Sequence, residues 1–455
     1  MRTVVVSLVL ILCLAAGRRA DGEWKAGWAS EKITPDQPMW MAGYGGRDHP
    51  AEGALTDLWA KALVLEDGQG RRAVLLTLDL VGIDRETSER VCRAIMERHS
   101  IDRSRIALCP SHTHTGPVVS RNLTTMHYRL LGPEQQTLVD RYSESLEKKM
   151  IGVVDRAFSG LAPARVEWGS GRTTLAVNRR NNKEADVVAA RDAGRLVGPL
   201  DHDVPVLAVR DAMGKLNVAV FGYACHATVL SFYQWSGDYP GFAQIELESL
   251  FPGCQAMFWA GCGGDQNPLP RRTVEMAQAY GRRLALAVSD VVTAPMEPIE
   301  DRLETAYAEI PLSFGTLPTP EQIAEQAAST DRFVASRGKM WQERLAAGET
   351  LPKSYPYPIA SWRLGSQCEW VFLGGEVVVD YAVRLKAERL GQRTWVAGYS
   401  NDVMAYIPSR RVLLEGGYEG GGAMVYYGQP TIWAETCEEE IVVGVHVQLG
   451  TLPPR

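Results

Sequence analysis

Short apolar segments alternate with longer segments of helical periodicity along most of this 455-residue chain. Apolar runs of this length are typical of buried strands, and the alternation predicts an α/β fold with a mixed β-sheet core flanked by helices. The expected strands cover residues 72–80, 105–109, 204–210, 216–223, 256–260 and 370–373. One helix is expected after Asp84, a good N-cap residue, and others over residues 133–158, 274–292, 377–390 and 434–445.

Two segments depart from this pattern. Residues 321–347 form a charged helical stretch between proline-containing segments, and we expect an insertion over the core rather than a separate domain. Five glycines between residues 416 and 422 predict a flexible loop.

The composition narrows the class of protein. Hydrophobic residues make up 45% of the chain and charged residues 22%, which excludes a disordered, collagen-like or polytopic membrane protein. The formal net charge of −6 argues against a nucleic-acid partner, which would require a basic surface.

The first 17 residues predict a secretory signal peptide, with cleavage after Gly17 or as late as residue 22. Arg2 precedes an apolar run that is too short to span a bilayer comfortably, and the small residues Ala15 and Gly17 follow it. Cleavage removes Arg2, which changes the net charge from −6 to −7. We therefore expect export to the periplasm or the extracellular space, no transmembrane span, and a mature chain compatible with peripheral membrane contact.

Export would place the cysteines in an oxidising compartment. Seven of the eight cysteines remain after cleavage, an odd number that leaves at least one unpaired. Cys254 and Cys262 are the closest pair in sequence and could form a disulfide. The other cysteines lie within apolar runs and are expected to be buried thiols.

The sharpest chemical motif is His112-Thr113-His114, which directly follows the expected strand 105–109. In extended backbone, residues two apart point the same way, so both imidazoles can face one site at a strand end. Two imidazoles on one face suit Zn²⁺ or a similar metal ion. A hydrogen-bonded structural pair is the alternative interpretation.

Three further polar side chains follow expected strands in the same way: His226, Asp265 and Glu376. Each has a structural alternative, since an Asp after glycines can cap a turn and a Glu can start a helix. Because all of them come after the carboxyl ends of strands, the sequence favours one composite site.

These residues belong to a longer ordered set of motifs that resembles the neutral/alkaline ceramidase family, in its catalytic N-terminal domain. The resemblance runs from about Ala26 to the C-terminus. The motifs are Ile33-Thr34-Pro35, Met41-Ala42-Gly43-Tyr44-Gly45, Leu78-Asp79-Leu80, His112-Thr113-His114-Thr115-Gly116-Pro117, Asn178-Arg179, His226, Ser236-Gly237-Asp238, Gly264-Asp265, Gly375-Glu376, Tyr406-Ile407 and Tyr418-Glu419-Gly420.

The resemblance implies one zinc ion per chain, bound by His112, His226, Glu376 and Tyr406. It also implies that His114, Arg179 and Tyr418 line the catalytic site, where they could stabilise an oxyanion or move a proton. In such a site zinc activates a water molecule that attacks the substrate amide.

Two features depart from the family pattern. Family members carry Ser within Gly-Asp-Val-Ser-Pro, whereas this chain has Asn267, which cannot act as a nucleophile, in Gly264-Asp265-Gln266-Asn267-Pro268. The immunoglobulin-like C-terminal domain of the family is not expected here, because the printed sequence stops at Arg455. We therefore expect one domain over residues 24–455.

The leading hypothesis from the sequence is an exported, zinc-dependent hydrolase that cleaves a linear amide such as an N-acyl lipid. Asn267 supports an alternative, a non-catalytic protein of the same fold that binds lipid or carbohydrate. A metallo-esterase or phosphoesterase is a third class, although phosphoester chemistry usually uses two metals and the ligands found suffice for one.

Overall fold

Two five-stranded sheets pack face to face in the computed structural model, which describes residues 23–389 and 393–452. The first sheet has the order β5 (Ile106–Pro110), β4 (Arg72–Leu78), β3 (Trp59–Glu66), β1 (Lys25–Lys32) and β6 (Ala162–Pro163). The second has the order β12 (Gln255–Ala260), β10 (Leu216–Tyr223), β9 (Asp203–Arg210), β7 (Arg165–Arg172) and β14 (Glu297–Pro298). The α/β class with a mixed sheet core is confirmed.

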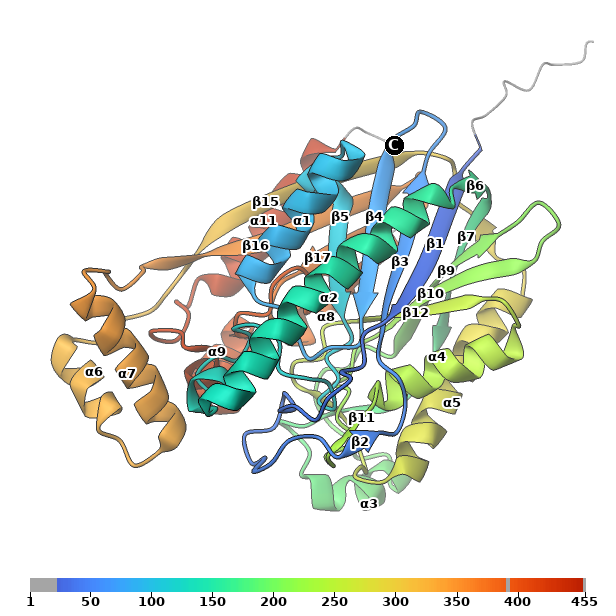
Figure 1. Ribbon diagram of the computed structural model, residues 1–455. Coiled ribbons are helices and arrows are strands. Elements are labelled where there is room, and N and C mark those ends of the chain that lie inside the picture. The colour runs from blue at the N-terminus through green and yellow to red at the C-terminus, as the bar shows by residue number, and fades with distance from the viewer. Residues whose placement is uncertain (1–22, 390–392, 453–455) are drawn as a thin grey trace, which may run out of the picture.

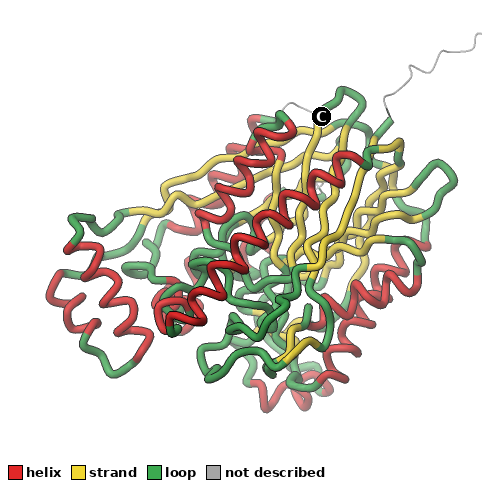
Figure 2. The backbone as a smooth tube through the Cα atoms, in the orientation of Figure 1, coloured by secondary structure: helices red, strands yellow, loops and turns green. Residues whose placement is uncertain are grey.

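A third sheet adjoins this pair and carries part of the site. Its order is β15 (Leu303–Ser313), β16 (Ser354–Leu364), β17 (Cys368–Leu373) and β19 (Thr394–Ala397). Figure 2 shows the strands gathered in the middle of the molecule with helices along their flanks.

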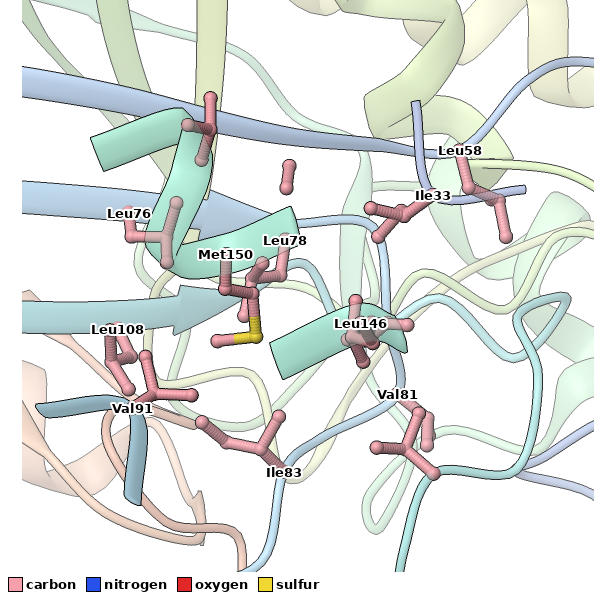
Figure 3. Close-up of a cluster of buried hydrophobic side chains, with 14 of the residues drawn as sticks. Ile33, Leu58, Leu76, Leu78, Val81, Ile83, Val91, Leu108, Leu146 and Met150 are labelled. Carbon is pink, nitrogen blue, oxygen red and sulfur yellow. The ribbon is translucent and has the colours of Figure 1, made fainter. Parts of the chain in front are cut away.

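The central strands are apolar on both faces because both faces are buried. In β3, Ala62 and Val64 pack under the helices while Leu63 and Leu65 face the second sheet. Figure 3 shows the helix-covered side of the first sheet, where Leu76 and other side chains meet Leu146 and Met150. Burial of this kind contributes about 25 cal/mol per Å² of apolar surface. It explains why these strands read as continuous apolar runs rather than alternating ones.

Helices cover the outer faces of the sheets (Figure 1). The first sheet is covered by α1 (Arg85–His99) and α2 (Pro133–Ser159), and the second by α4 (Asp238–Leu250) and α5 (Val274–Thr293). The third sheet packs against α8 (Asp380–Glu388) and α11 (Cys437–Thr451). Asp84 caps α1 as expected, accepting a hydrogen bond from the Thr87 amide. Across the described part of the chain, no helix is both long and apolar enough to cross a bilayer.

The expected insertion forms a pair of helices, α6 (Pro320–Ala327) and α7 (Arg332–Ala346), between β15 and β16. The pair projects from one end of the molecule (Figure 1). The glycine-rich segment expected as a flexible loop instead contains a helical turn, Tyr418–Gly422, between α9 (Arg410–Glu415) and α10 (Met424–Tyr427). The proposed signal peptide, residues 1–17, lies outside the described residues.

The disulfide that the sequence left open between Cys254 and Cys262 does not form in the structure. The two residues flank the six-residue strand β12, and both thiols are buried and free. An extended strand rises about 3.3 Å per residue, so its two ends are far beyond the roughly 5.5–6 Å Cα separation of a disulfide. The remaining cysteines of the described chain, Cys92, Cys109, Cys225, Cys368 and Cys437, are buried thiols as expected.

Candidate functional site

The site lies where parallel strands of all three large sheets end. β5 runs parallel to β4, β12 to β10, and β19 to β17. The loops that follow these strands are joined by backbone pairing, with Thr113 against Ala227 and Gly261 against Ala397. Side chains from distant parts of the sequence therefore meet at one edge of the molecule's core, as in many α/β enzymes.

His112 does not follow the extended geometry that the sequence suggested. Its φ is 61°, so the residue has left-handed backbone, which is rare outside glycine. The turn nevertheless brings its Nε2 to 3.0 Å from His114 Nε2. His112 Nδ1 donates a hydrogen bond to the Val81 carbonyl at 2.6 Å. Because that carbonyl only accepts, Nε2 of a neutral His112 carries the free lone pair.

His226 is fixed in the same way. Its Nδ1 lies 2.6 Å from the Gly263 carbonyl, which leaves Nε2 as the free acceptor. This Nε2 lies 3.0 Å from Glu376 Oε2 and 3.2 Å from the Tyr406 hydroxyl oxygen. A backbone carbonyl that orients an imidazole is the usual outer-shell partner of a histidine metal ligand.

Glu376 and Tyr406 come together through a pair of very short strands. β18 (Glu376–Val377) and β20 (Tyr406–Ile407) run parallel, with Glu376 opposite Tyr406. Glu376 Oε2 also lies 3.1 Å from His112 Nε2. The structure thus brings together all four residues that the resemblance implied as ligands.

Close packing of the glycine loop against β18 makes this arrangement possible. A Cβ atom on Gly264 would lie 2.6 Å from the Glu376 carbonyl oxygen, nearer than real Cβ contacts. The Gly264 amide donates to the Val377 carbonyl at 2.8 Å. Only glycine allows the loop to approach this strand so closely.

The charge state of the cluster follows from its burial. Burial raises the pKa of the Glu376 carboxyl, but the adjacent His112 and His226 outweigh it and hold that pKa well below its usual value. Burial, reinforced by Arg179, lowers the pKa of His226 to about 4. The cluster therefore presents an ionised carboxylate beside a neutral imidazole near pH 7.

His114 lies beside this cluster and packs against the loop that contains Gly43 and Tyr44. Its ring makes an edge contact with Tyr44, and a Cβ on Gly43 would lie 2.5 Å from its Cγ. Burial and the neighbouring histidines lower the pKa of His114 well below the usual value. The His112, His114 and His226 nitrogens all lie within 4.8 Å of one another, a spacing that could hold a metal ion.

Arg179 lies between the two predicted tyrosines. Its guanidinium carbon is 5.8 Å from the Tyr406 ring centre and 5.7 Å from that of Tyr418, which is 45% exposed. Its nitrogens donate hydrogen bonds to Glu419 Oε1 at 2.7 Å, Asn267 Oδ1 at 3.2 Å, the Gly264 carbonyl at 2.9 Å and the Tyr406 hydroxyl at 3.1 Å. All eight predicted site residues therefore lie in one neighbourhood.

The sequence allowed either a chemical role or a turn-capping role for Asp265. In the structure its carboxylate accepts hydrogen bonds from neighbouring segments of the protein. Its carboxylate accepts hydrogen bonds from Asn178 Nδ2 and the Val379 amide, each at 2.9 Å. It thereby fixes the loop that carries Asn267.

Tyr427 and Glu419 contact the predicted site residues, but the sequence analysis did not single them out. The Tyr427 hydroxyl donates a short hydrogen bond to Glu376 Oε1, which leaves Oε2 facing the histidines. Glu419 anchors Arg179 and also accepts from Arg180 at 2.7 Å. Tyr427 carried no sequence signal, whereas Glu419 stood inside the quoted Tyr418-Glu419-Gly420 motif.

Comparisons with known proteins agree with this architecture. A family model described as neutral/alkaline non-lysosomal ceramidase, N-terminal, matches residues 24–261. The neutral ceramidase of Pseudomonas aeruginosa is 22% identical over 528 residues, covering 98% of this chain and 75% of that protein. Neutral ceramidase 1 of Arabidopsis thaliana is 23% identical over 252 residues, covering 54% of this chain and 32% of that protein.

Solved structures share the fold. The crystal structure of the Pseudomonas aeruginosa neutral ceramidase matches with a TM-score of 0.70 and 20% identity, covering 94% of this chain and 74% of that chain. A structure described as ceramidase complexed with C2 matches with a TM-score of 0.70 and 19% identity, covering 92% and 73%.

The family model spans more than half of the chain, and it places the protein among hydrolases that act on amide bonds. The chain belongs to the neutral/alkaline non-lysosomal ceramidase family.

Proposed function

We propose that this protein is an exported, zinc-dependent hydrolase that cleaves a linear amide, an N-acyl lipid or a related compound. One observation carries the proposal. Two imidazole nitrogens, each of which carries the lone pair when its ring is neutral, face the oxygen of an ionised carboxylate at 3.0 and 3.1 Å. Acceptors facing one another at this distance repel unless a cation or a proton lies between them.

The chemistry of the donor set fits zinc. Zn²⁺ binds imidazole nitrogen and carboxylate oxygen at about 2.0–2.2 Å in tetrahedral geometry, which places ligand atoms roughly 3.3–3.6 Å apart. His112, His226 and Glu376 would hold the ion, with the Tyr406 oxygen as fourth ligand, as the family resemblance implies. When bound, zinc would polarise the amide carbonyl and acidify a water molecule.

The chain's own residues would supply the remaining chemistry. His114 Nε2 lies next to the ligand cluster, and its lowered pKa keeps the imidazole neutral and able to accept a proton. The same nitrogen could then return that proton to the leaving amine. Tyr418 is the most exposed of the aromatic groups around Arg179, so its hydroxyl could reach a bound substrate.

Substrate and location are part of the proposal. The two relatives described above are called neutral ceramidases, which supports an amide of a fatty acid as substrate. Residues 1–17 support export as a signal peptide, with residues 24–455 as one hydrolase domain. The site combines side chains from residues 112 to 427, which supports a single domain over two independent ones.

Metal analysis combined with a substrate panel tests the proposal. The purified mature protein is expected to contain about one zinc per chain, and His226→Ala to lose it. The panel contains N-dodecanoylethanolamine, a short-chain ceramide and p-nitrophenyl dodecanoate. Zinc-dependent cleavage of an amide is the expected result. Absence of zinc would contradict the metal site, cleavage of the ester alone would favour a metallo-esterase, and binding without turnover would favour a non-catalytic protein.

A further inference from the structure

The amide of Asn267 has a fixed orientation in the site. Arg179 donates from Nη1 to the Asn267 side chain at 3.2 Å. A guanidinium carries donors only, so the Asn267 atom that faces it must be the carbonyl oxygen. The donor-only chemistry of the guanidinium therefore sets the orientation of the carboxamide. In this orientation the Asn267 Nδ2 group points away from Arg179.

The Asn267 Nδ2 group has no protein partner in the part of the chain that the structure describes. Within residues 23–389 and 393–452, no side-chain or backbone acceptor receives its hydrogens, and the atom keeps contact with solvent. The side chain as a whole is only 5% exposed. Asn267 is therefore a largely buried side chain whose two N–H donors are unused within the described residues and keep contact with solvent.

Asn267 adjoins the proposed catalytic site. One guanidinium joins Asn267 Oδ1 to the Tyr406 hydroxyl, and it lies between the Tyr406 and Tyr418 rings. Asn267 is the middle residue of β13 (Gln266–Pro268). Its backbone pairs with Val177 of β8 (Ala176–Asn178). A donor on a rigid strand beside a reacting centre is preorganised, which is what an oxyanion donor requires.

We propose that Asn267 Nδ2 donates a hydrogen bond to the acyl carbonyl oxygen of the substrate and stabilises the charge that develops there. Arg179 is then a positioning residue: it fixes the Asn267 carboxamide and the Tyr406 hydroxyl, and its nitrogens are occupied by protein acceptors. This inference rests on the proposed amide hydrolysis and assigns a role to the residue that stands in place of the family serine.

Asn267→Asp separates a donor role from a structural one. The variant keeps the oxygen that Arg179 contacts and replaces only the N–H donors by a second acceptor. A structural role predicts that Asn267→Asp behaves like the wild type while Asn267→Ala is impaired. The donor role predicts that both variants lose about 10²–10³ in kcat/KM. Asn181→Asp, at an exposed position, introduces the same charge as a control.

Binding of dodecanamide by the zinc-loaded protein gives a second readout that needs no turnover. Calorimetry is expected to show about tenfold weaker binding by Asn267→Asp than by the wild type or Asn181→Asp, with unchanged zinc content. Equal kcat/KM and equal binding in Asn267→Asp would overturn the donor role while leaving the proposed hydrolysis intact. A wild-type protein that cleaves no amide would overturn the proposed function, and the binding comparison would then decide whether Asn267 recognises a carbonyl. Wild-type protein that does not bind dodecanamide would overturn that recognition too.

Discussion

Glu376 and Tyr406 lie directly opposite each other in the parallel pairing of β18 with β20. Paired residues of neighbouring strands project their side chains to the same side, so this short ladder delivers a carboxylate and a phenol to one point. His226 Nε2 meets both, at 3.0 and 3.2 Å. Two residues of backbone pairing therefore position half of the proposed metal site.

Tyr406→Phe is expected to weaken zinc binding because it removes one proposed ligand atom and the acceptor of an Arg179 hydrogen bond. Tyr418→Phe is the matched control, since the Tyr418 ring lies 5.2 Å from the Tyr406 ring but its residue is not a proposed ligand. Tyr418→Phe should keep zinc and lose about 10²-fold or more in kcat. Competition with a chelator measures the affinity, and equal zinc affinity in the two variants would contradict the ligand assignment.

Tyr427→Phe is expected to lower zinc affinity by about 10–100-fold without removing a ligand. The variant frees Glu376 Oε1, so the carboxylate can rotate away from the histidines. Tyr426→Phe tests the same change at the neighbouring residue, whose ring contacts Phe333 rather than Glu376. An unchanged affinity in Tyr427→Phe would show that the carboxylate needs no support from this hydroxyl.

Gly264→Ala is expected to destabilise the fold by about 1–3 kcal/mol and to reduce zinc content, because the new methyl group would collide with the Glu376 carbonyl. Gly46→Ala is a suitable control, since a Cβ there meets nothing within 4 Å. Urea unfolding of both variants provides the measurement. Similar midpoints would mean that the loop can move away from β18 at little cost.

The buried His127 is expected to make the protein less stable on acidification. Burial, with Arg47 and Arg332, lowers the pKa of His127 to about 3, and Nε2 accepts a hydrogen bond from the Gly43 amide at 3.1 Å. The unfolded chain takes up this proton near pH 6.5 while the folded chain does not, so stability falls as the pH drops from about 6.5 towards 3. The loss from this group reaches about 2 kcal/mol at pH 5.

His127→Gln should remove this contribution, because the glutamine oxygen can accept from the Gly43 amide without titrating. Its free energy of unfolding should decline less between pH 7 and 5 than that of the wild type. The exposed His49→Gln variant should not lessen the decline, because Asp48 raises the pKa of His49 rather than lowering it. Parallel curves for wild type and His127→Gln would assign the acid sensitivity to other groups.

The strand and helix pattern could be predicted because strands that are buried on both faces consist of nearly continuous apolar residues. The predictions differ from the structure where contacts between distant segments override the local sequence pattern. The helix expected over residues 377–390 begins later, at Asp380, because Val377 pairs with Ile407. The disulfide left open between Cys254 and Cys262 does not form, because closeness in sequence is not closeness in space when a strand intervenes.

The sequence by itself determined the α/β class, the family, and which residue types follow the strand ends. Those properties depend on hydrophobic periodicity and on ordered motifs, both of which are local. The tertiary structure decided which atoms meet. Backbone carbonyls of Val81 and Gly263 select the lone-pair nitrogens of His112 and His226, and Arg179 selects the orientation of Asn267. Hydrogen-bond direction depends on partners far away in the chain, so no spacing of residues could have shown it.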